Sequence, residues 1–310
     1  MNALVVLPAH NEALTVGDTI RRIRLELPDA TFWVVDNSSS DATRKVALEN
    51  GAIVLFEPKV GKGFAVQQAF MRVKKDFDLV FMVDADDTYM FDELNMAANL
   101  VFDKKFDMVV GNRVTSSDLH VQRTHAFRKG HAHGNFLLSK LFWFLFGIRI
   151  KDTLSGWRVM SPGFVGSFSG GVGGFEIETE LNAHAFLTSA AVTNVDVKYV
   201  GRTVGSHSKL RTYSDGWRIL RRQFSLFFLE RPRIAYGVVS LPWIIASIFL
   251  IRNVLISYFQ LGLIPNFPSL IAGVGCFISG ILLLIAGVIL ENTRAIRVQA
   301  ARYKFFEYYK

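Results

Sequence analysis

Cysteine is nearly absent from this sequence. Cys276 is the single cysteine among 310 residues, so the chain forms no intrachain disulfide. Two phosphate-binding signatures are missing as well. No G-x-G-x-x-G follows the first apolar strand, which argues against a dinucleotide cofactor. The Gly-Lys-Gly at 61–63 is not a Walker loop, because Phe56 and Gly63 stand where that loop has its first Gly and its Ser or Thr.

Internal repeats and low-complexity tracts are also missing. The N-terminus lacks the basic and apolar regions of a signal peptide, so we expect the N-terminal domain to stay in the cytosol. Acidic residues are too few to balance the basic ones. The 35 Lys and Arg against 27 Asp and Glu give a formal charge of +8, which indicates an anionic partner, either nucleic acid or a phospholipid surface. A hydrophobic fraction of 50% and two long apolar runs near the C-terminus favour the membrane.

The most informative stretch is an apolar run at 79–83 that ends in three carboxylates, Asp84, Asp86 and Asp87. Such a run is typical of a strand buried on both faces of a parallel sheet, and ligands bind beyond the carboxyl ends of such strands. Clustered carboxylates repel one another, so a cation would hold them ionised, and hard oxygen ligands select Mg²⁺ or Mn²⁺. The alternative is an acidic turn that caps the helix starting near Phe91.

Strands and helices alternate along the first 200 residues, which predicts an α/β domain with a parallel sheet. Polar or acidic residues follow the first, second and fourth strands, so functional groups should gather at one edge of the sheet. Lys62 opens a helix, and it lies either in a tight turn or near a phosphate at a helix N-terminus. The expected strands are 3–7, 31–35, 53–56, 79–83, 107–110 and 192–200.

The segment between the last two of these strands is less regular. Residues 136–148 are apolar and aromatic but too short to span a bilayer, so they form a buried helix or an interfacial one. Residues 151–158 read as a polar turn. The acids at 175–180 begin a helix, where they suit the helix dipole.

The C-terminal third predicts membrane attachment. Residues 201–213 form a basic loop, and 217–233 form a basic, aromatic segment suited to a lipid surface. Two uncharged runs, 234–251 (extendable to 259) and 268–290, predict a transmembrane hairpin with 260–267 as its connector. Arginines on both flanks place both flanks in the cytosol. The expected domains are a catalytic domain at 1–215, a juxtamembrane segment at 216–233, the hairpin at 234–291 and a basic tail at 292–310.

The motifs at 8–12, 36–41, 61–63 and 84–89 stand in the order seen in family 2 glycosyltransferases of GT-A fold. Those at 152–158, 175–180 and 208–216 resemble the polyprenyl-phosphate glycosyltransferases, relatives of dolichyl-phosphate mannose synthase. The resemblance covers residues 3–233. It implies a nucleotide-sugar donor (a UDP- or GDP-sugar), a divalent metal, an inverting transfer and a polyprenyl phosphate acceptor, undecaprenyl or dolichyl.

The same resemblance assigns residues to roles. It places the nucleotide sugar on Pro8, Asn11, Glu12, Asp36, Lys62 and Asp84, and the metal on Asp84 and Asp86. It places the acceptor phosphate on Arg113, Arg128, Ser208 and Lys209, and catalysis on Asp86, Asp152, Arg113, Lys209 and Arg211. Asp152 matches a carboxylate proposed as a base, although a lipid phosphate is already mostly ionised at neutral pH and needs little such help. Asp87 departs from the family, where many relatives have Gly.

Three other functions fit parts of the pattern. A glycosyltransferase acting on a lipid-linked oligosaccharide or a polysaccharide is one, but the Gln-x-x-Arg-Trp motif and additional spans of processive synthases are missing. A non-catalytic nucleotide-sugar-binding membrane protein is another, and the intact Asp84 and Asp86 pair argues against it. Nucleic-acid binding is disfavoured because much of the basic excess flanks the predicted spans. The sequence leaves a homo-oligomer open and predicts an integral protein of the cell membrane.

Overall fold

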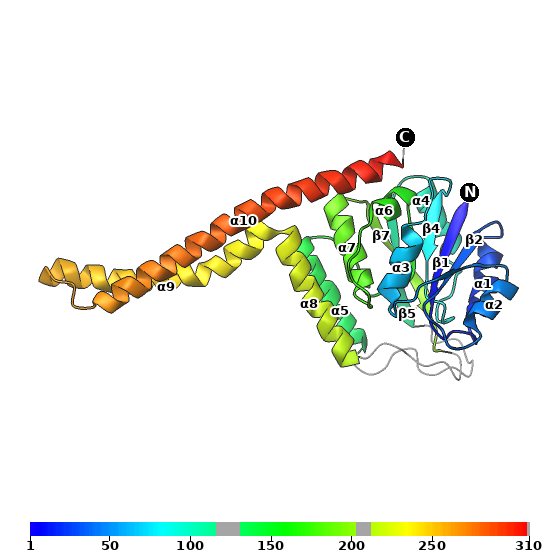
Figure 1. Cartoon of the computed structure of the whole chain (residues 1–310), viewed down its shortest axis with the longest axis horizontal. Coiled ribbons are helices and arrows are strands. Elements are labelled where there is room, and N and C mark those ends of the chain that lie inside the picture. Colours follow the sequence, from blue (N-terminus) through cyan, green and yellow to red (C-terminus); the bar gives the residue numbers. More distant parts are fainter. Residues whose placement is uncertain (116–130, 203–211, 309–310) are drawn as a thin grey trace. The chain divides into compact units, whose positions relative to one another are not determined.

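The computed structural model of this chain describes residues 1–115, 131–202 and 212–308 (Figure 1). The chain divides into two compact units. The first comprises Met1–Gln223 together with Ala300–Lys310, and the second is Phe224–Gln299. The first unit contains one sheet and the helices that connect its strands. In chain order its elements are β1 (Ala3–Ala9), α1 (Val16–Glu26), β2 (Thr31–Asp36), α2 (Thr43–Glu49), β3 (Ile53–Phe56), α3 (Lys62–Phe70), β4 (Leu79–Met82), α4 (Leu94–Phe102), β5 (Met108–Thr115), α5 (His131–Phe146), β6 (Arg158–Met160), α6 (Pro162–Ser167), α7 (Ile177–Thr188) and β7 (Val192–Tyr199).

The seven strands are ordered β3-β2-β1-β4-β6-β5-β7. All neighbouring pairs run parallel except those of β6, which lies antiparallel to both β4 and β5. The predicted α/β class with a mostly parallel sheet is therefore confirmed. The expected turn at 151–158 runs into β6, which begins at Arg158. Three residues are too few to display the two-residue period of a strand, so the sequence did not predict β6.

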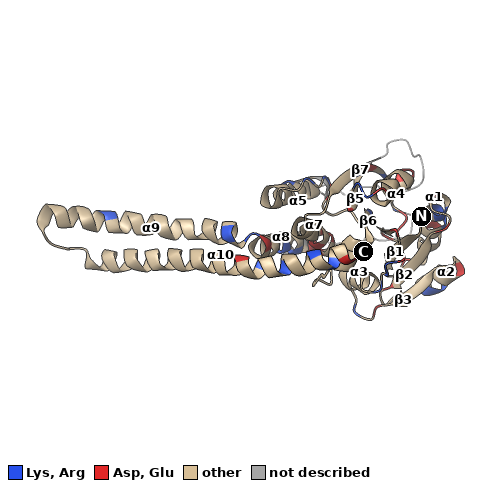
Figure 2. Cartoon of the chain, turned by 90° about the horizontal axis from the view of Figure 1, so that it is seen from above, with Lys and Arg blue, Asp and Glu red and all other residues tan. Residues whose placement is uncertain are grey.

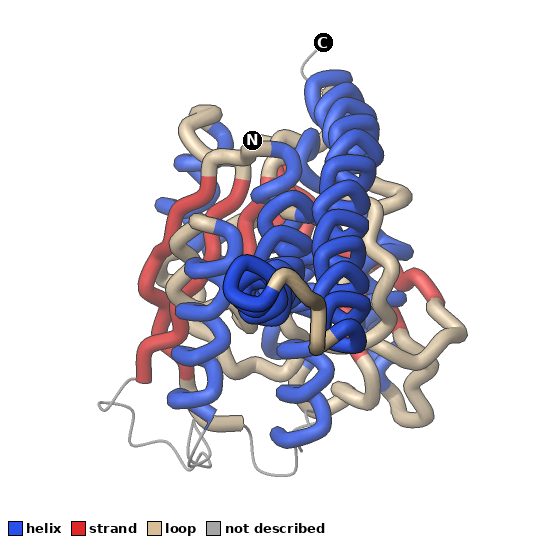
Figure 3. The backbone as a smooth tube through the Cα atoms, turned by 90° about the vertical axis from the view of Figure 1, so that its left-hand side faces the viewer, coloured by secondary structure: helices blue, strands red, loops and turns tan. Residues whose placement is uncertain are grey.

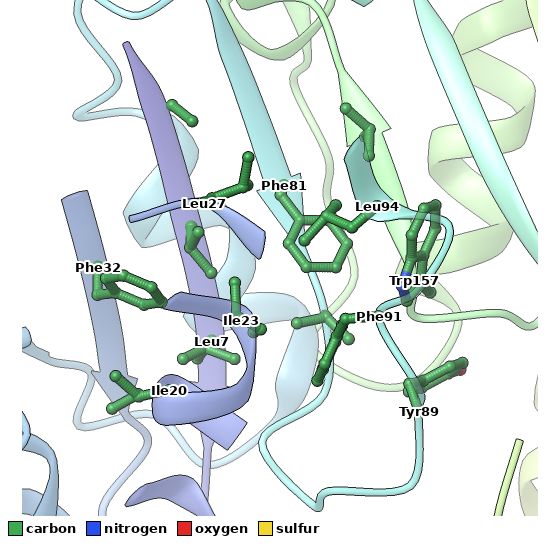
Figure 4. Packing of buried hydrophobic residues seen from close by; sticks show 14 of the residues in the cluster. Leu7, Ile20, Ile23, Leu27, Phe32, Phe81, Tyr89, Phe91, Leu94 and Trp157 are labelled. Atoms are coloured by element: carbon green, nitrogen blue, oxygen red, sulfur yellow. The ribbon is translucent and has the colours of Figure 1, made fainter. Parts of the chain in front are cut away.

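The core explains why the central strands are apolar on both sides. Residues 3, 5, 7 and 9 of β1 belong to one hydrophobic cluster with α1 and α4, whereas Leu4 and Val6 are equally buried and point to the other face. Figure 4 shows side chains of this cluster, among them Leu7, Ile20 and Phe81. Rigid packing of β1 and β4 fixes where their carboxyl ends lie, and these ends carry the polar motifs.

Helix α5 has two different faces. Phe142, Leu145 and Phe146 are buried, while aromatic and aliphatic side chains on the rest of the helix are exposed, and Phe144 reaches 82% exposure. The sequence had left a buried and an interfacial helix open, and the structure shows a packed face beside an exposed apolar one. The exposed large apolar residues are Phe136, Leu137, Trp143 and Phe144.

The helix α8 (Thr212–Glu230) leads from the first unit into the second, which contains α9 (Pro232–Leu261) and the start of α10 (Phe267–Glu307). Both long helices are long and apolar enough to cross a membrane, and α10 carries no charged residue before Glu291 (Figure 2). Gly262, with a φ of 67°, ends α9 in the left-handed conformation. The connection that follows joins the two helices, as seen end-on in Figure 3. The predicted apolar runs lie within these helices, and α10 extends 17 residues beyond the predicted second run, from 290 to Glu307.

Three glycines of α10, spaced seven residues apart, lie against α9. A Cβ added at Gly273 or Gly280 would stand 2.8 Å from Ile251 or Ile244, and one at Gly287 would stand 3.0 Å from Cβ of Tyr236. Small residues at such positions let two apolar helices approach closely, which is how helices pair where no water drives them together.

We expect Gly280→Leu to destabilise the full chain in detergent by about 1–3 kcal/mol, because the added side chain must push α9 away. Gly275→Leu is the matched control, since no atom lies within 4 Å of a Cβ at Gly275. Thermal unfolding of the two purified variants measures the difference. Equal melting temperatures would contradict close packing at Gly280.

Candidate active site

Asp84 and Asp86 lie just beyond the carboxyl end of β4, and each contacts a cation from a distant part of the chain. Lys62 Nζ, at the start of α3, lies 2.5 Å from Asp84 Oδ1. Arg202, after β7, lies 2.5 Å from Asp86 Oδ2, whose other oxygen accepts a hydrogen bond of 2.6 Å from Thr88. The structure places the ammonium group of Lys62 among carboxylates at the start of α3.

Lys62 is shared between two carboxylates. Its Nζ is 2.5 Å from Asp84 Oδ1 and 2.5 Å from Oε1 of Glu178, in the first turn of α7. Burial acts to lower the pKa of Lys62, but the two carboxylates outweigh it, so that pKa is raised and the lysine keeps its proton. Burial raises the pKa of Glu178 while Lys62 opposes the shift. For Asp84 the cation prevails over burial and its pKa is lowered.

A separate ion pair links β5 to the segment before β6. Arg113 donates from Nε to Asp152 Oδ2 (2.6 Å) and from Nη2 to Oδ1 (2.9 Å), in the bidentate geometry that fits a guanidinium to a carboxylate. Oδ1 also accepts from Asn135 of α5 (2.8 Å) and from the backbone of Leu154 (3.2 Å). Burial acts to raise the pKa of Asp152, but Arg113 and these donors lower it. This carboxylate is held as an ionised anchor, a poor arrangement for a base.

The carboxyl ends of β1 and β2 bring the other motifs to the same edge of the sheet. Ala9 is paired with Asp36 in the parallel register, and Pro8 with Val35. Asp36 Oδ1 accepts from the backbone of Ser39, and the backbone of Glu12 donates to Thr43. Asn11, in the left-handed conformation, accepts from the backbone of Ser40. The expectation that polar residues after strands one, two and four meet at one edge is thus confirmed.

Asp87 follows the same strand but has a different ion-pair partner from Asp84 and Asp86. Its carboxylate forms an ion pair with Arg22 of α1, whose guanidinium lies over the ring of Phe91. Asp87 also has a φ of 54°, a conformation that glycine adopts without strain. Asp87 is therefore part of the packing between α1 and the turn after β4, and its carboxylate faces Arg22.

Glu178 was missed by sequence reasoning, which had assigned the acids at 175–180 to the helix dipole. A further missed residue is Arg158, fully buried and hydrogen-bonded to Asn182 (2.7 Å) and to the carbonyl of Ser155 (3.0 Å). The signal for Glu178 is weak: it is one of three acids in a short stretch, and the sequence does not show which one points inward. Four predicted residues, Arg128, Ser208, Lys209 and Arg211, lie outside the described residues.

Comparison with known proteins identifies the family. Residues 4–161 match Glycosyl transferase family 2. The chain belongs to this family. It is 32% identical over 221 residues to the low-salt glycan biosynthesis hexosyltransferase Agl6 of Haloferax volcanii, covering 70% of this chain and 52% of that protein. It is 30% identical over 237 residues to glycosyltransferase AglJ of the same organism, covering 76% and 75%. A dolichyl-phosphate hexose transferase of that organism is 29% identical over 154 residues, covering 50% and 64%.

Solved structures share the fold of this family 2 glycosyltransferase. Glucosyl-3-phosphoglycerate synthase of Mycobacterium tuberculosis, crystallised with Mn²⁺ and UDP-glucose, aligns with a TM-score of 0.55 at 18% identity, over 73% of this chain and 78% of that one. Mannosyl-3-phosphoglycerate synthase of Rubrobacter xylanophilus gives 0.55 at 22% identity, over 74% of both chains. The GT-A fold and an enzyme of the glycosyltransferase class, both predicted from the sequence, are confirmed.

The carboxylates at this site fit a divalent cation whose remaining ligands come from the substrate and water. Among the described residues, no three His, Cys, Asp or Glu side chains converge as a metal site of their own. Asp84 and Asp86 instead offer two hard carboxylates at the strand end, the arrangement in which Mg²⁺ or Mn²⁺ takes its remaining ligands from water and phosphate. Gly156 leaves room for the Asp84 carboxylate, because a Cβ at Gly156 would stand 2.5 Å from Asp84 Oδ2.

Proposed function

We propose that this glycosyltransferase moves a hexose from a UDP- or GDP-sugar to a polyprenyl phosphate, with inversion and with a divalent metal. The observation that carries the proposal is the cluster of Asp84, Asp86, Lys62 and Arg202 at the carboxyl edge of the sheet. Two carboxylates that can hold a cation lie there beside a lysine and an arginine, the side-chain types that commonly bind phosphate. Together these side chains have the charges needed to bind a nucleotide diphosphate and to stabilise it as the leaving group.

The membrane acceptor is supported by apolar surface. The helices α9 and α10 are long and apolar enough to span a bilayer, and α5 exposes Phe136, Trp143 and Phe144. Exposed aromatics on a helix favour the interfacial region of a membrane. The similarity to a dolichyl-phosphate hexose transferase points to the same class of acceptor. We place the catalytic unit in the cytosol, with both flanks of the hairpin on that side of the cell membrane.

The reaction follows from the charges. A non-bridging oxygen of the lipid phosphate attacks the anomeric carbon, forming the new C–O bond as the bond to the nucleotide diphosphate breaks, with inversion at carbon. A divalent ion on Asp84 and Asp86 would supply neutralisation of the leaving diphosphate. Lys62 lies where it can meet the same diphosphate, and Arg113 offers a cation for the acceptor phosphate. The acceptor is already mostly ionised, because the second pKa of a phosphate monoester is about 6, so no base is required.

The test is a donor screen with the purified full chain in detergent. We expect label from a UDP- or GDP-hexose to enter organic-extractable lipid when undecaprenyl or dolichyl phosphate and Mg²⁺ or Mn²⁺ are present, and excess EDTA to stop it. Donor binding without any turnover would favour the non-catalytic alternative. Transfer to a lipid-linked oligosaccharide or polysaccharide, with none to lipid phosphate, would favour the other acceptor class.

A further inference from the structure

Glu178 is a buried carboxylate whose hydrogen bonding is incomplete. Its side chain is 3% exposed, its Oε1 lies 2.5 Å from Lys62 Nζ, and its Oε2 is buried with no hydrogen-bond partner among the described residues. Arg158 is close enough to act on its charge without a hydrogen bond. An acid placed this way costs folding free energy unless its charge has a use, because burying a carboxylate is unfavourable.

The backbone around Glu178 and Lys62 is held as one frame. The amide of Gly63 donates to the carbonyl of Gly173 (2.9 Å), and Gln67 donates to the carbonyl of Val172 (2.7 Å). A Cβ at Gly63 would stand 2.2 Å from that same Val172 oxygen, so the close approach requires glycine. Glu180 secures the other end of the segment by accepting from the amide of Gly171 (2.9 Å). The start of α3 and the approach to α7 are therefore fixed to each other.

Lys62 cannot keep its ion pair with Asp84 in every step of the proposed reaction. When a divalent cation takes the Asp84 carboxylate, Lys62 loses that partner and faces a new positive charge. Its second carboxylate stays in place, because Glu178 is anchored by the frame. The ammonium group then remains next to the cluster, free to meet an incoming diphosphate.

We propose that Glu178 is a positioning residue that retains Lys62 beside the diphosphate site when the divalent cation occupies Asp84, and thereby couples metal binding to nucleotide binding. The charges explain the coupling. The three cations Lys62, Arg202 and Arg158 balance the three carboxylates Asp84, Asp86 and Glu178, so a cation or a diphosphate entering alone leaves net charge in a site of limited solvent access. The two together nearly cancel, and Glu178 offsets the lysine that the metal sets free. This inference rests on the proposed function.

Glu178→Gln removes one negative charge from the site with almost no change in side-chain shape. Without metal, the variant site carries one more net positive charge, so a diphosphate should bind more tightly than in the wild type. With metal, Lys62 has lost its counter-ion and repels the cation, so the gain in nucleotide affinity from Mn²⁺ should shrink. A general loss of structure would weaken nucleotide binding both with and without metal. Tighter binding without metal, together with a smaller gain from Mn²⁺, therefore distinguishes a positioning role from a folding defect.

The experiment titrates UDP and GDP, in parallel, against the full chain in detergent by calorimetry, in EDTA and in Mn²⁺. We expect Glu178→Gln to tighten binding at least about threefold in EDTA, and to reduce the factor by which Mn²⁺ tightens it by at least about tenfold, a coupling change of about 1.4 kcal/mol. Glu180→Gln is the matched control on the same turn, since Glu180 pairs with Arg222 and the glutamine oxygen can still accept from the amide of Gly171. It should leave the ratio unchanged.

Two further outcomes separate the possible failures. In a Lys62→Met background, Glu178→Gln should no longer alter the coupling, because Glu178 acts through Lys62. An unchanged ratio in Glu178→Gln, or weaker binding in EDTA, would overturn the positioning role while leaving the proposed function standing. A wild-type chain that binds neither nucleotide under any condition would instead overturn the proposed function.

Discussion

Asp86→Asn is expected to lower the initial rate of sugar transfer by about a hundredfold to a thousandfold, the usual effect of removing one preorganised electrostatic contact. Asp86 is 5% exposed and holds its position through Thr88. The amide of asparagine can keep the bond to Thr88 but carries no charge for a cation. The nucleotide diphosphate would then leave with only one carboxylate supporting its metal.

Asp87→Asn supplies the control for this prediction. Asp87 is the neighbouring acid and equally buried, but its carboxylate forms an ion pair with Arg22 of α1. Asparagine tolerates the left-handed backbone at this position, so the control should lose some stability and keep its turnover. Rates are measured as label transferred to lipid phosphate, with Mn²⁺ binding followed in parallel. Near-normal transfer by Asp86→Asn, or full activity of the wild type in EDTA, would reject the metal role.

The edge of the sheet was predictable because parallel strands enforce it. Once apolar runs at 3–7 and 79–83 are read as buried strands, their carboxyl ends must lie together, and so must the residues that follow them. The sequence therefore brings Pro8, Asp36 and Asp84 to one edge without any knowledge of the loops. The two uncharged runs within α9 and α10 were predictable for a different reason, because their length and lack of charge are local properties of the chain.

The partners of these residues were not predictable, because they depend on side-chain direction over long separations. Glu178 is 116 residues from Lys62, and nothing in a run of three acids shows which one turns inward. Arg202 belongs to a basic segment that reads as solvent-exposed, yet it reaches Asp86. The role of Asp87 was obscured for the opposite reason: it is adjacent in sequence to the site but points to α1.

Arg113→Met is expected to reduce transfer by about a hundredfold or more and also to destabilise the fold by about 3–5 kcal/mol. Two causes are combined in this variant. The acceptor phosphate loses a cation, and Asp152, which is 3% exposed, is left as a buried charge without its bidentate partner. A drop in activity alone would therefore not show that Arg113 contacts the substrate.

The double variant Arg113→Met with Asp152→Asn separates the two causes. Asparagine removes the unpaired charge and can still accept from the backbone of Leu154, so much of the lost stability should return, as measured by denaturation of the full chain in detergent. Transfer should stay near the level of Arg113→Met, because the cation for the phosphate is still missing. Recovery of transfer in step with stability would make Arg113 a structural partner of Asp152 only. Asp152→Asn alone completes the cycle: if Asp152 anchors Arg113 and is no base, its residual activity should keep the pH profile of the wild type.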